Sequence, residues 1–156
     1  MDSDLWIQIL ELVVLLALSG FFSSAETAMV SVSKIRLRTL EEEGNKKAAL
    51  ALKILENQSK MLSAILIGNN LVNTSAASIA SVIAYSFGGA AVSIATFIIT
   101  FLILVFGEIT PKTWATINAD KLALAYAPII IFLMKILTPV IWFVNLFSSG
   151  ILKLMG

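Results

Sequence analysis

Three long apolar stretches constrain this chain more than any other feature. Residues 5–33, 61–87 and 90–116 are each long enough, as a helix, to cross a hydrocarbon core of roughly 30 Å. Only a few charged and amide side chains interrupt them. The sequence therefore predicts an all-α integral membrane protein with three transmembrane helices.

Composition supports the same class. Hydrophobic residues make up 58% of the chain and charged residues only 13%, with a mean hydropathy of +0.94. A soluble domain with a wetted surface does not carry this balance. The net charge of +1 provides no argument for binding nucleic acid. Residues 1–156 are predicted to form one transmembrane domain that has the lipid bilayer as its solvent.

The segment 34–60 differs from the stretches on either side because basic and apolar residues alternate in it. This alternation predicts an amphipathic juxtamembrane helix on the membrane surface, with a short soluble helical loop as the alternative. Seven of the 11 Lys and Arg residues lie here. Basic loops stay on the cytoplasmic side, so the segment is expected to be cytoplasmic and the N-terminus outside.

The C-terminal segment 120–155 is apolar but irregular. Pro128, Lys135 and Pro139 each argue against one straight span facing lipid. We expect a broken helical hairpin at the cytoplasmic interface. A fourth span is the alternative, since the apolar length alone permits one.

Two serines in the first span lie on one helix face. Ser19 and Ser23 are four residues apart, so their hydroxyls follow one line along the helix. Such hydroxyls can be successive ligands of a cation. They can equally serve close helix packing, in which serine bonds back to its own helix.

Three asparagines fall within about one turn of the second span. Asn69, Asn70 and Asn73 would be costly in hydrocarbon unless their amides found partners. Spacings of three and four residues let at least two of them share a face. Their carbonyl oxygens are candidate ligands for a cation, and an interhelical amide network is the alternative.

The third span contains a predicted break in its helix. Pro111 has no N–H, so in a continuing helix the carbonyl four residues earlier, that of Gly107, loses its partner. Glu108 lies beside that carbonyl, and the two together suit a cage of oxygens for a hard cation. The alternative places Glu108 at the cytoplasmic interface in an ion pair with Lys112 at i+4.

Glu26 is the remaining deep acid, near the end of the first span. It is close enough along the helix to Lys34 to reach the interface. A structural salt bridge and a supporting role in transport are both open for this residue.

The absence of Cys and His excludes several chemistries. Without them the chain has no disulfide, no thiol catalysis, none of the usual zinc sites and no Ser-His-Asp machinery. An intramembrane hydrolase would need a base beside Ser19 or Ser23, and no Lys lies there in the sequence. We expect a protein that is not an enzyme, with a metal site built from oxygen.

Three segments together resemble a known family. Residues 19–28 (SGFFSSAETA), 67–73 (IGNNLVN) and 107–112 (GEITPK) are similar, in order and spacing, to the transmembrane domain of the cyclin-M/CorC family of magnesium transporters. The resemblance covers nearly the whole chain. One departure is large, because family members typically continue into cytoplasmic nucleotide-binding domains that do not occur within these 156 residues.

This resemblance implies a homodimer in the plasma membrane, the inner membrane of the cell, that moves Mg²⁺, with Na⁺ exchange as the proposed driving force. Carried onto this sequence, it implies that the metal ligands are Ser19, Ser23, Asn70, Glu108 and the Gly107 carbonyl. Support would come from Asn69, Asn73, Pro111 and Glu26.

The leading hypothesis is therefore a secondary transporter of Mg²⁺. The ion would sit between the polar helix breaks while rocking of the helices exposes it to each side in turn. A membrane scaffold or divalent-cation sensor is the alternative, because it would use the same residues to bind an ion without moving it.

Overall fold

The computed structural model describes residues 2–156, in which all regular secondary structure is helical. The elements are α1 (Asp2–Ser31), α2 (Lys34–Glu42), α3 (Lys46–Glu56), α4 (Gln58–Tyr85), α5 (Gly89–Leu102), the π-helical segment η1 (Ile103–Ile109), α6 (Thr110–Ile117), α7 (Ala119–Ile136) and α8 (Thr138–Met155). The all-α membrane fold expected from the sequence is confirmed.

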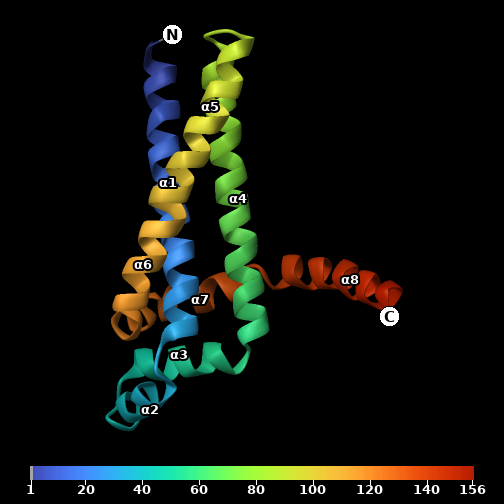
Figure 1. Ribbon diagram of the computed structural model, residues 1–156. Helices are drawn as coiled ribbons and strands as arrows, with labels where there is room; N and C mark the ends of the chain where they lie inside the picture. Colours follow the sequence, from blue (N-terminus) through green and yellow to red (C-terminus); the bar gives the residue numbers. More distant parts are fainter. Residues whose placement is uncertain (1) are drawn as a thin grey trace.

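Three long helical units run side by side. They are α1, α4 and the continuous helix formed by α5, η1 and α6 (Figure 1). The third unit starts against α4 and then contacts α1 through η1 and α6. The unit therefore crosses the groove between α1 and α4, and its irregular part lies against α1.

Length and composition identify helices able to cross a membrane. Three in the described chain qualify, namely Ser3–Ser31, Gly89–Ile117 and Thr138–Met155. Helix α4 is just as long, with 28 residues, but its three asparagines lower its hydropathy. Since α4 packs along α1, it shares the direction of the spans (Figure 1). The chain is a multi-pass membrane protein.

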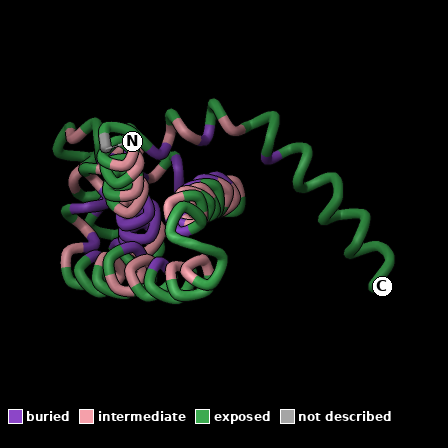
Figure 2. The backbone as a smooth tube through the Cα atoms, turned by 90° about the horizontal axis from the view of Figure 1, so that it is seen from above, coloured by how far each residue is buried: buried purple, intermediate pink, exposed green. Residues whose placement is uncertain are grey.

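Helix α8 points in a different direction from the bundle. It projects sideways, crosswise to α1 and α4, in both views of the backbone (Figures 1 and 2). A flat bilayer crossed by the bundle cannot also be crossed by a helix in this orientation. The alternative of a fourth span therefore does not fit this arrangement, although α8 is apolar enough to span.

The C-terminal hairpin differs in detail from the expectation. A break is present between α7 and α8, next to Pro139. However, α8 extends away from α7 instead of folding back on it (Figure 2). Pro128 lies inside α7 without ending it. Of the α8 residues only Ile141, in the first turn, is buried, so no buried apolar contact draws the rest of this helix back.

The amphipathic segment 34–60 forms two helices with a turn between them. Gly44 in that turn has a positive φ of 92°, and Asn45 caps α3 by accepting from the backbone N–H groups of Lys47 and Ala48. The apolar residues Leu37, Ile54 and others face inward. A second turn lies at Gly88, which has a φ of 113° and separates α4 from α5.

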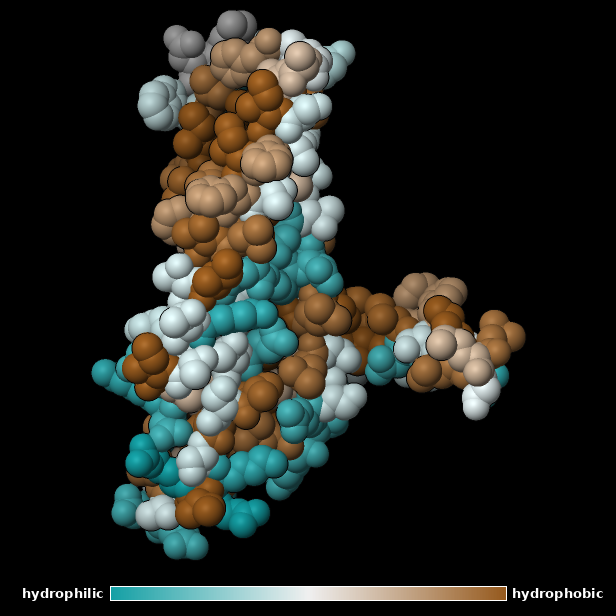
Figure 3. Space-filling model, in the orientation of Figure 1, coloured by the Kyte–Doolittle hydropathy of each residue, from teal (hydrophilic) through white to brown (hydrophobic). Residues whose placement is uncertain are grey.

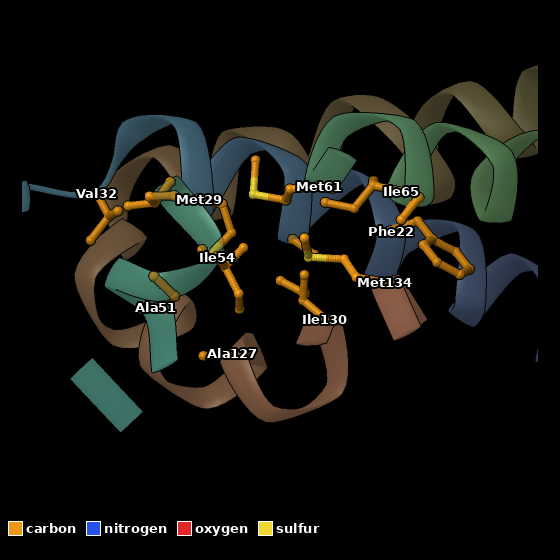
Figure 4. Packing of buried hydrophobic residues seen from close by; sticks show 14 of the residues in the cluster. Phe22, Met29, Val32, Ala51, Ile54, Met61, Ile65, Ala127, Ile130 and Met134 are labelled. Carbon is orange, nitrogen blue, oxygen red and sulfur yellow. The ribbon is translucent and has the colours of Figure 1, made fainter. Parts of the chain in front are cut away.

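The buried core lies at one end of the bundle. Side chains of α1, α3, α4 and α7 interlock there, among them Met29, Ile54, Met61, Ile130 and Met134 (Figure 4). Helices α3 and α7 thus hold the lower ends of α1 and α4 together. Above this core the surface is mainly apolar, and polar side chains gather toward the lower end (Figure 3). The candidate site lies between these two zones along α1.

Candidate cation site

The polar stripe predicted on α1 is buried in the bundle. Ser19 is 1% exposed and Ser23 is 0% exposed. Ser19 Oγ donates to Asn69 Oδ1 at 3.4 Å, whereas Ser23 Oγ has no hydrogen-bond partner among the described residues. Ser23 lies one turn further along the same face of α1. A buried hydroxyl without a partner is costly, so Ser23 has a free oxygen to offer a ligand.

Asn69 connects all three helical units. Its Nδ2 donates to Glu108 Oε1 at 3.0 Å, and its Oδ1 accepts from both Ser19 and Asn73, the latter at 3.5 Å. A network of this kind was the alternative to direct ligation when the sequence was considered. The network and direct ligation are compatible. A cation that displaced the two weak bonds to Asn69 Oδ1, at 3.4 and 3.5 Å, would meet the same amide oxygen.

Asn70 occupies a different position from the one expected for a ligand. Its side chain is exposed on α4, and no hydrogen bond joins it to the cluster in the described part of the chain. Asn73 lies nearer, and its Oδ1 is buried without a partner. In this conformation the amides that reach the site are therefore Asn69 and Asn73.

The predicted break in the third unit takes the form of a π-helix. The N–H of Thr110 donates to the carbonyl of Val105, five residues earlier. Pro111 has no N–H, so in this register the Phe106 carbonyl loses its donor. That carbonyl lies only 3.1 Å from the place a Cβ at Gly20 would occupy. The π register thus makes Phe106, the residue before Gly107, the one whose carbonyl lacks the donor that Pro111 cannot provide.

Gly107 brings η1 into close contact with α1. A Cβ at Gly107 would lie 2.5 Å from Ser19 Oγ and 3.1 Å from Ser19 Cβ. No side chain fits in that space. The glycine therefore lets the backbone of η1, which also carries Glu108, lie directly against Ser19 of α1.

Glu108 is held by Asn69 and by a lysine. Lys112 Nζ lies 3.2 Å from Glu108 Oε2, an i,i+4 ion pair, and 3.7 Å from Glu26 Oε2. Glu26 thus pairs with Lys112 of α6 and not with Lys34, the partner considered from the sequence. Lys112 is therefore part of the site, although the ligands implied by the family resemblance did not include it. The i+4 spacing had indicated its contact with Glu108.

The oxygens near this site have mixed chemistry. In residues 2–156 no group of three or more acidic side chains is suited to hold a metal ion. The potential ligands are instead hydroxyls, amide oxygens, backbone carbonyls and the carboxylate of Glu108, with Glu26 nearby. Such a set suits a hard cation and offers nothing to a soft one.

Comparison with known proteins identifies the family. The family model described as "Cyclin M transmembrane N-terminal domain" matches residues 10–156. The chain belongs to this family. The segments that define the candidate site in this cyclin-M domain, on α1, α4 and η1, all lie within the matched region.

Curated relatives support the assignment. A "UPF0053 protein" of Haemophilus influenzae is 46% identical over 146 residues, which is 93% of this chain and 35% of the relative. The "UPF0053 inner membrane protein YfjD" of Escherichia coli is 34% identical over 140 residues, 89% of this chain and 33% of the relative.

A third relative has a functional name. The "Polyamine export protein" of Haemophilus influenzae is 29% identical over 168 residues, covering 99% of this chain and 39% of that protein. The cyclin-M domain thus spans about a third of the length of the curated relatives it matches.

Proposed function

We propose that this domain moves Mg²⁺ across the membrane as a secondary transporter. One observation carries the proposal: oxygens from α1, α4 and η1 converge where η1 departs from α-helical geometry. Asn69 links Ser19 to Glu108 there, and Gly107 allows the backbones to approach. Broken helices that meet at a polar cluster are the usual form of ion sites in transporters.

Ligand chemistry favours Mg²⁺ over softer metals. Ser19, Ser23, Asn69 and Glu108 present hard oxygens, and the chain has no His or Cys. A single carboxylate balances half the charge of the ion. Mg²⁺ keeps its waters tightly, so neutral oxygens can replace or hydrogen-bond those waters while binding stays weak enough for release.

Transport requires the site to open alternately to the two sides. In our proposal α1 and the α5–η1–α6 unit rock against each other around the Gly107 contact. Na⁺ is also an oxygen-loving ion, and we propose that its gradient drives Mg²⁺ export through the same ligands. If Na⁺ and Mg²⁺ bind in turn to this one site, no second cation site is needed to couple their movements.

We propose that α2 and α3 face the cytoplasm and that the N-terminus lies outside. The basic residues concentrated in segment 34–60 support this orientation. The Escherichia coli relative is named an inner membrane protein, and we propose the same membrane here. Helix α8 would then lie along the cytoplasmic interface.

We also propose that the domain forms a homodimer. Asn70, Thr74 and Ser78 follow each other at four-residue spacing and are all exposed on α4. An exposed Asn amide facing lipid is costly. A second copy packed against this face would cover the amide, and small polar residues favour such helix contacts.

A second candidate substrate is an organic polyamine. One relative is named a polyamine export protein, and one contact in this structure favours the idea: the primary ammonium of Lys112 already lies between Glu26 and Glu108. A polyamine could present the same group to the same carboxylates. Mg²⁺ remains our first candidate because Ser19, Ser23 and Asn69 add oxygens that an ammonium does not need.

Flux into proteoliposomes tests both candidates. We would record Mg²⁺ with a trapped fluorescent indicator under an imposed Na⁺ gradient, and radiolabelled spermidine in parallel, for the full chain. Glu108→Ala should abolish Mg²⁺ flux, while Glu56→Ala, an exposed acid on α3, should leave it unchanged. Spermidine flux without Mg²⁺ flux would establish the second candidate.

The alternative of a scaffold or sensor predicts a different pattern. Mg²⁺ would raise the melting temperature of the protein without any flux of either cation. That result would overturn the transporter proposal for this domain, provided that the same preparation is folded and reconstituted.

A further inference from the structure

Lys112 places a positive charge of the protein inside the candidate cation site. Its ammonium lies between two carboxylates from different helical units, 3.2 Å from Glu108 and 3.7 Å from Glu26. Glu108 and Lys112 are one turn apart on the third unit, whereas Glu26 belongs to α1. The ammonium thus occupies a position where a mobile cation would also be attracted.

Both oxygens of Glu108 are engaged in this conformation. Oε1 accepts from Asn69 at 3.0 Å, and Oε2 faces Lys112. A cation that binds the Glu108 carboxylate must therefore displace one of these groups. The ammonium is the one that a cation repels, since both are positively charged.

Glu26 provides the displaced ammonium with a second partner. The side chain of Glu26 is 41% exposed and that of Lys112 is 43% exposed, against 22% for Glu108. A shift of Lys112 from Glu108 toward Glu26 therefore moves its charge toward water. Since Glu26 is already close, the exchange needs only a change of side-chain rotamer.

We propose that Lys112 is a tethered counter-ion that holds Glu108 when no cation is bound and transfers to Glu26 when the transported cation arrives. This inference rests on the proposed function and assigns Lys112 and Glu26 as positioning residues. The lysine lowers the affinity of the site for its cation, because binding must first separate an existing ion pair. It also assists release, because the ammonium returns to Glu108 as the cation leaves.

Affinity measurements test the proposal without any flux. Mg²⁺ binding to purified full-length chain would be followed by titration calorimetry for the wild type, Lys112→Met and Lys112→Arg. Removal of the tethered charge should tighten Mg²⁺ binding by about tenfold, whereas Arg, which keeps the charge and pairs at least as well with a carboxylate, should give no tightening. Lys47→Met, at an exposed lysine of α3, is the matched control and should change nothing.

The loss of any nearby positive charge would tighten cation binding to some degree, so the affinity change alone does not show that the ammonium moves. Lysine reactivity provides the second readout. Mg²⁺ should accelerate amine labelling of Lys112 as its ammonium leaves the less exposed carboxylate, and should leave Lys47 unaffected. Binding that Lys112→Met weakens or leaves unaltered, or labelling of Lys112 that Mg²⁺ does not accelerate, would overturn this inference alone. No Mg²⁺ binding by either the wild type or Lys112→Met would overturn the proposed function itself.

Discussion

The side-chain amide of Asn69 donates to Glu108 Oε1 at 3.0 Å and so joins α4 to η1. The other end of the same amide accepts from Ser19 of α1. One side chain therefore ties the three helical units together at the candidate site.

Asn69→Ala should destabilise the protein and impair its transport. A hydrogen bond to a charged group contributes about 1.5–3 kcal/mol, and its loss would leave Glu108 with Lys112 alone. We expect a melting temperature several degrees lower, as an order-of-magnitude estimate from the usual dependence on stability. Asn145→Ala, at an exposed asparagine of α8 far from this network, is the matched control. An equal fall in melting temperature for both variants would contradict the placement of Asn69 at the centre of the network.

Gly107→Ala should force η1 away from α1. The added Cβ would lie 2.5 Å from Ser19 Oγ, and overpacking of this kind costs about 1–3 kcal/mol. Thermal denaturation in detergent would measure the loss. Gly89→Ala is the control, because nothing lies within 4 Å of its Cβ position.

A second substitution distinguishes a clash from a general effect of alanine in this helix. Ser19→Ala removes the Oγ atom but leaves the Cβ that a residue at 107 would meet at 3.1 Å. The double variant Ser19→Ala, Gly107→Ala should therefore recover part of the stability. No recovery at all would indicate that another contact limits position 107.

Asp120→Ala should loosen the start of α2. Asp120 Oδ1 accepts from the Ser33 backbone N–H at 3.1 Å, and Oδ2 pairs with Arg36 at 2.5 Å. The arginine is 67% exposed, so the ion pair itself contributes only about 0–1 kcal/mol. We expect faster hydrogen exchange across α2, with α3 much less affected. If the amides of α2 exchanged equally slowly in Asp120→Ala and in the wild type, α2 would be held by its apolar face alone.

Helix α8 should lie in the plane of the membrane. The chain has no Cys, so Val140→Cys and Leu154→Cys allow single spin labels near the two ends of the helix. An in-plane helix predicts nearly equal depths for the two labels. A spanning helix would separate them by about 20 Å along the membrane normal, from a rise of about 1.5 Å per residue.

Some of this site could be predicted from residue identity alone. Pro111 after Gly107 requires a break in any helix, and a break is present. The i,i+4 spacing of Glu108 and Lys112 likewise indicated their ion pair. Local rules succeed here because both relationships lie within one helix.

Relationships between helices were harder to predict. Asn69 and Asn70 are neighbours about 100° apart around the helix axis, so the rotation of α4 decides which one faces the site. Gly68 bears on that rotation, because a Cβ there would lie 2.5 Å from the Phe22 ring of α1. The pairing of Glu26 with Lys112 also depends on how α1 meets α6. No spacing along the sequence specifies either contact.

The π-helical segment has a geometric consequence for everything that follows it. Its turns hold more residues than α-helical turns, because each bond reaches back five residues instead of four. If η1 tightened to α-helical geometry, one residue would change register and α6 would turn by about 100° relative to α5. Lys112 would then swing away from the Glu26 carboxylate of α1 without any bend in the long helix, whereas Glu108, its i,i+4 neighbour, would stay within reach. The extra residue in the wide turn of η1 thus allows α6 to rotate about the axis of the long helix.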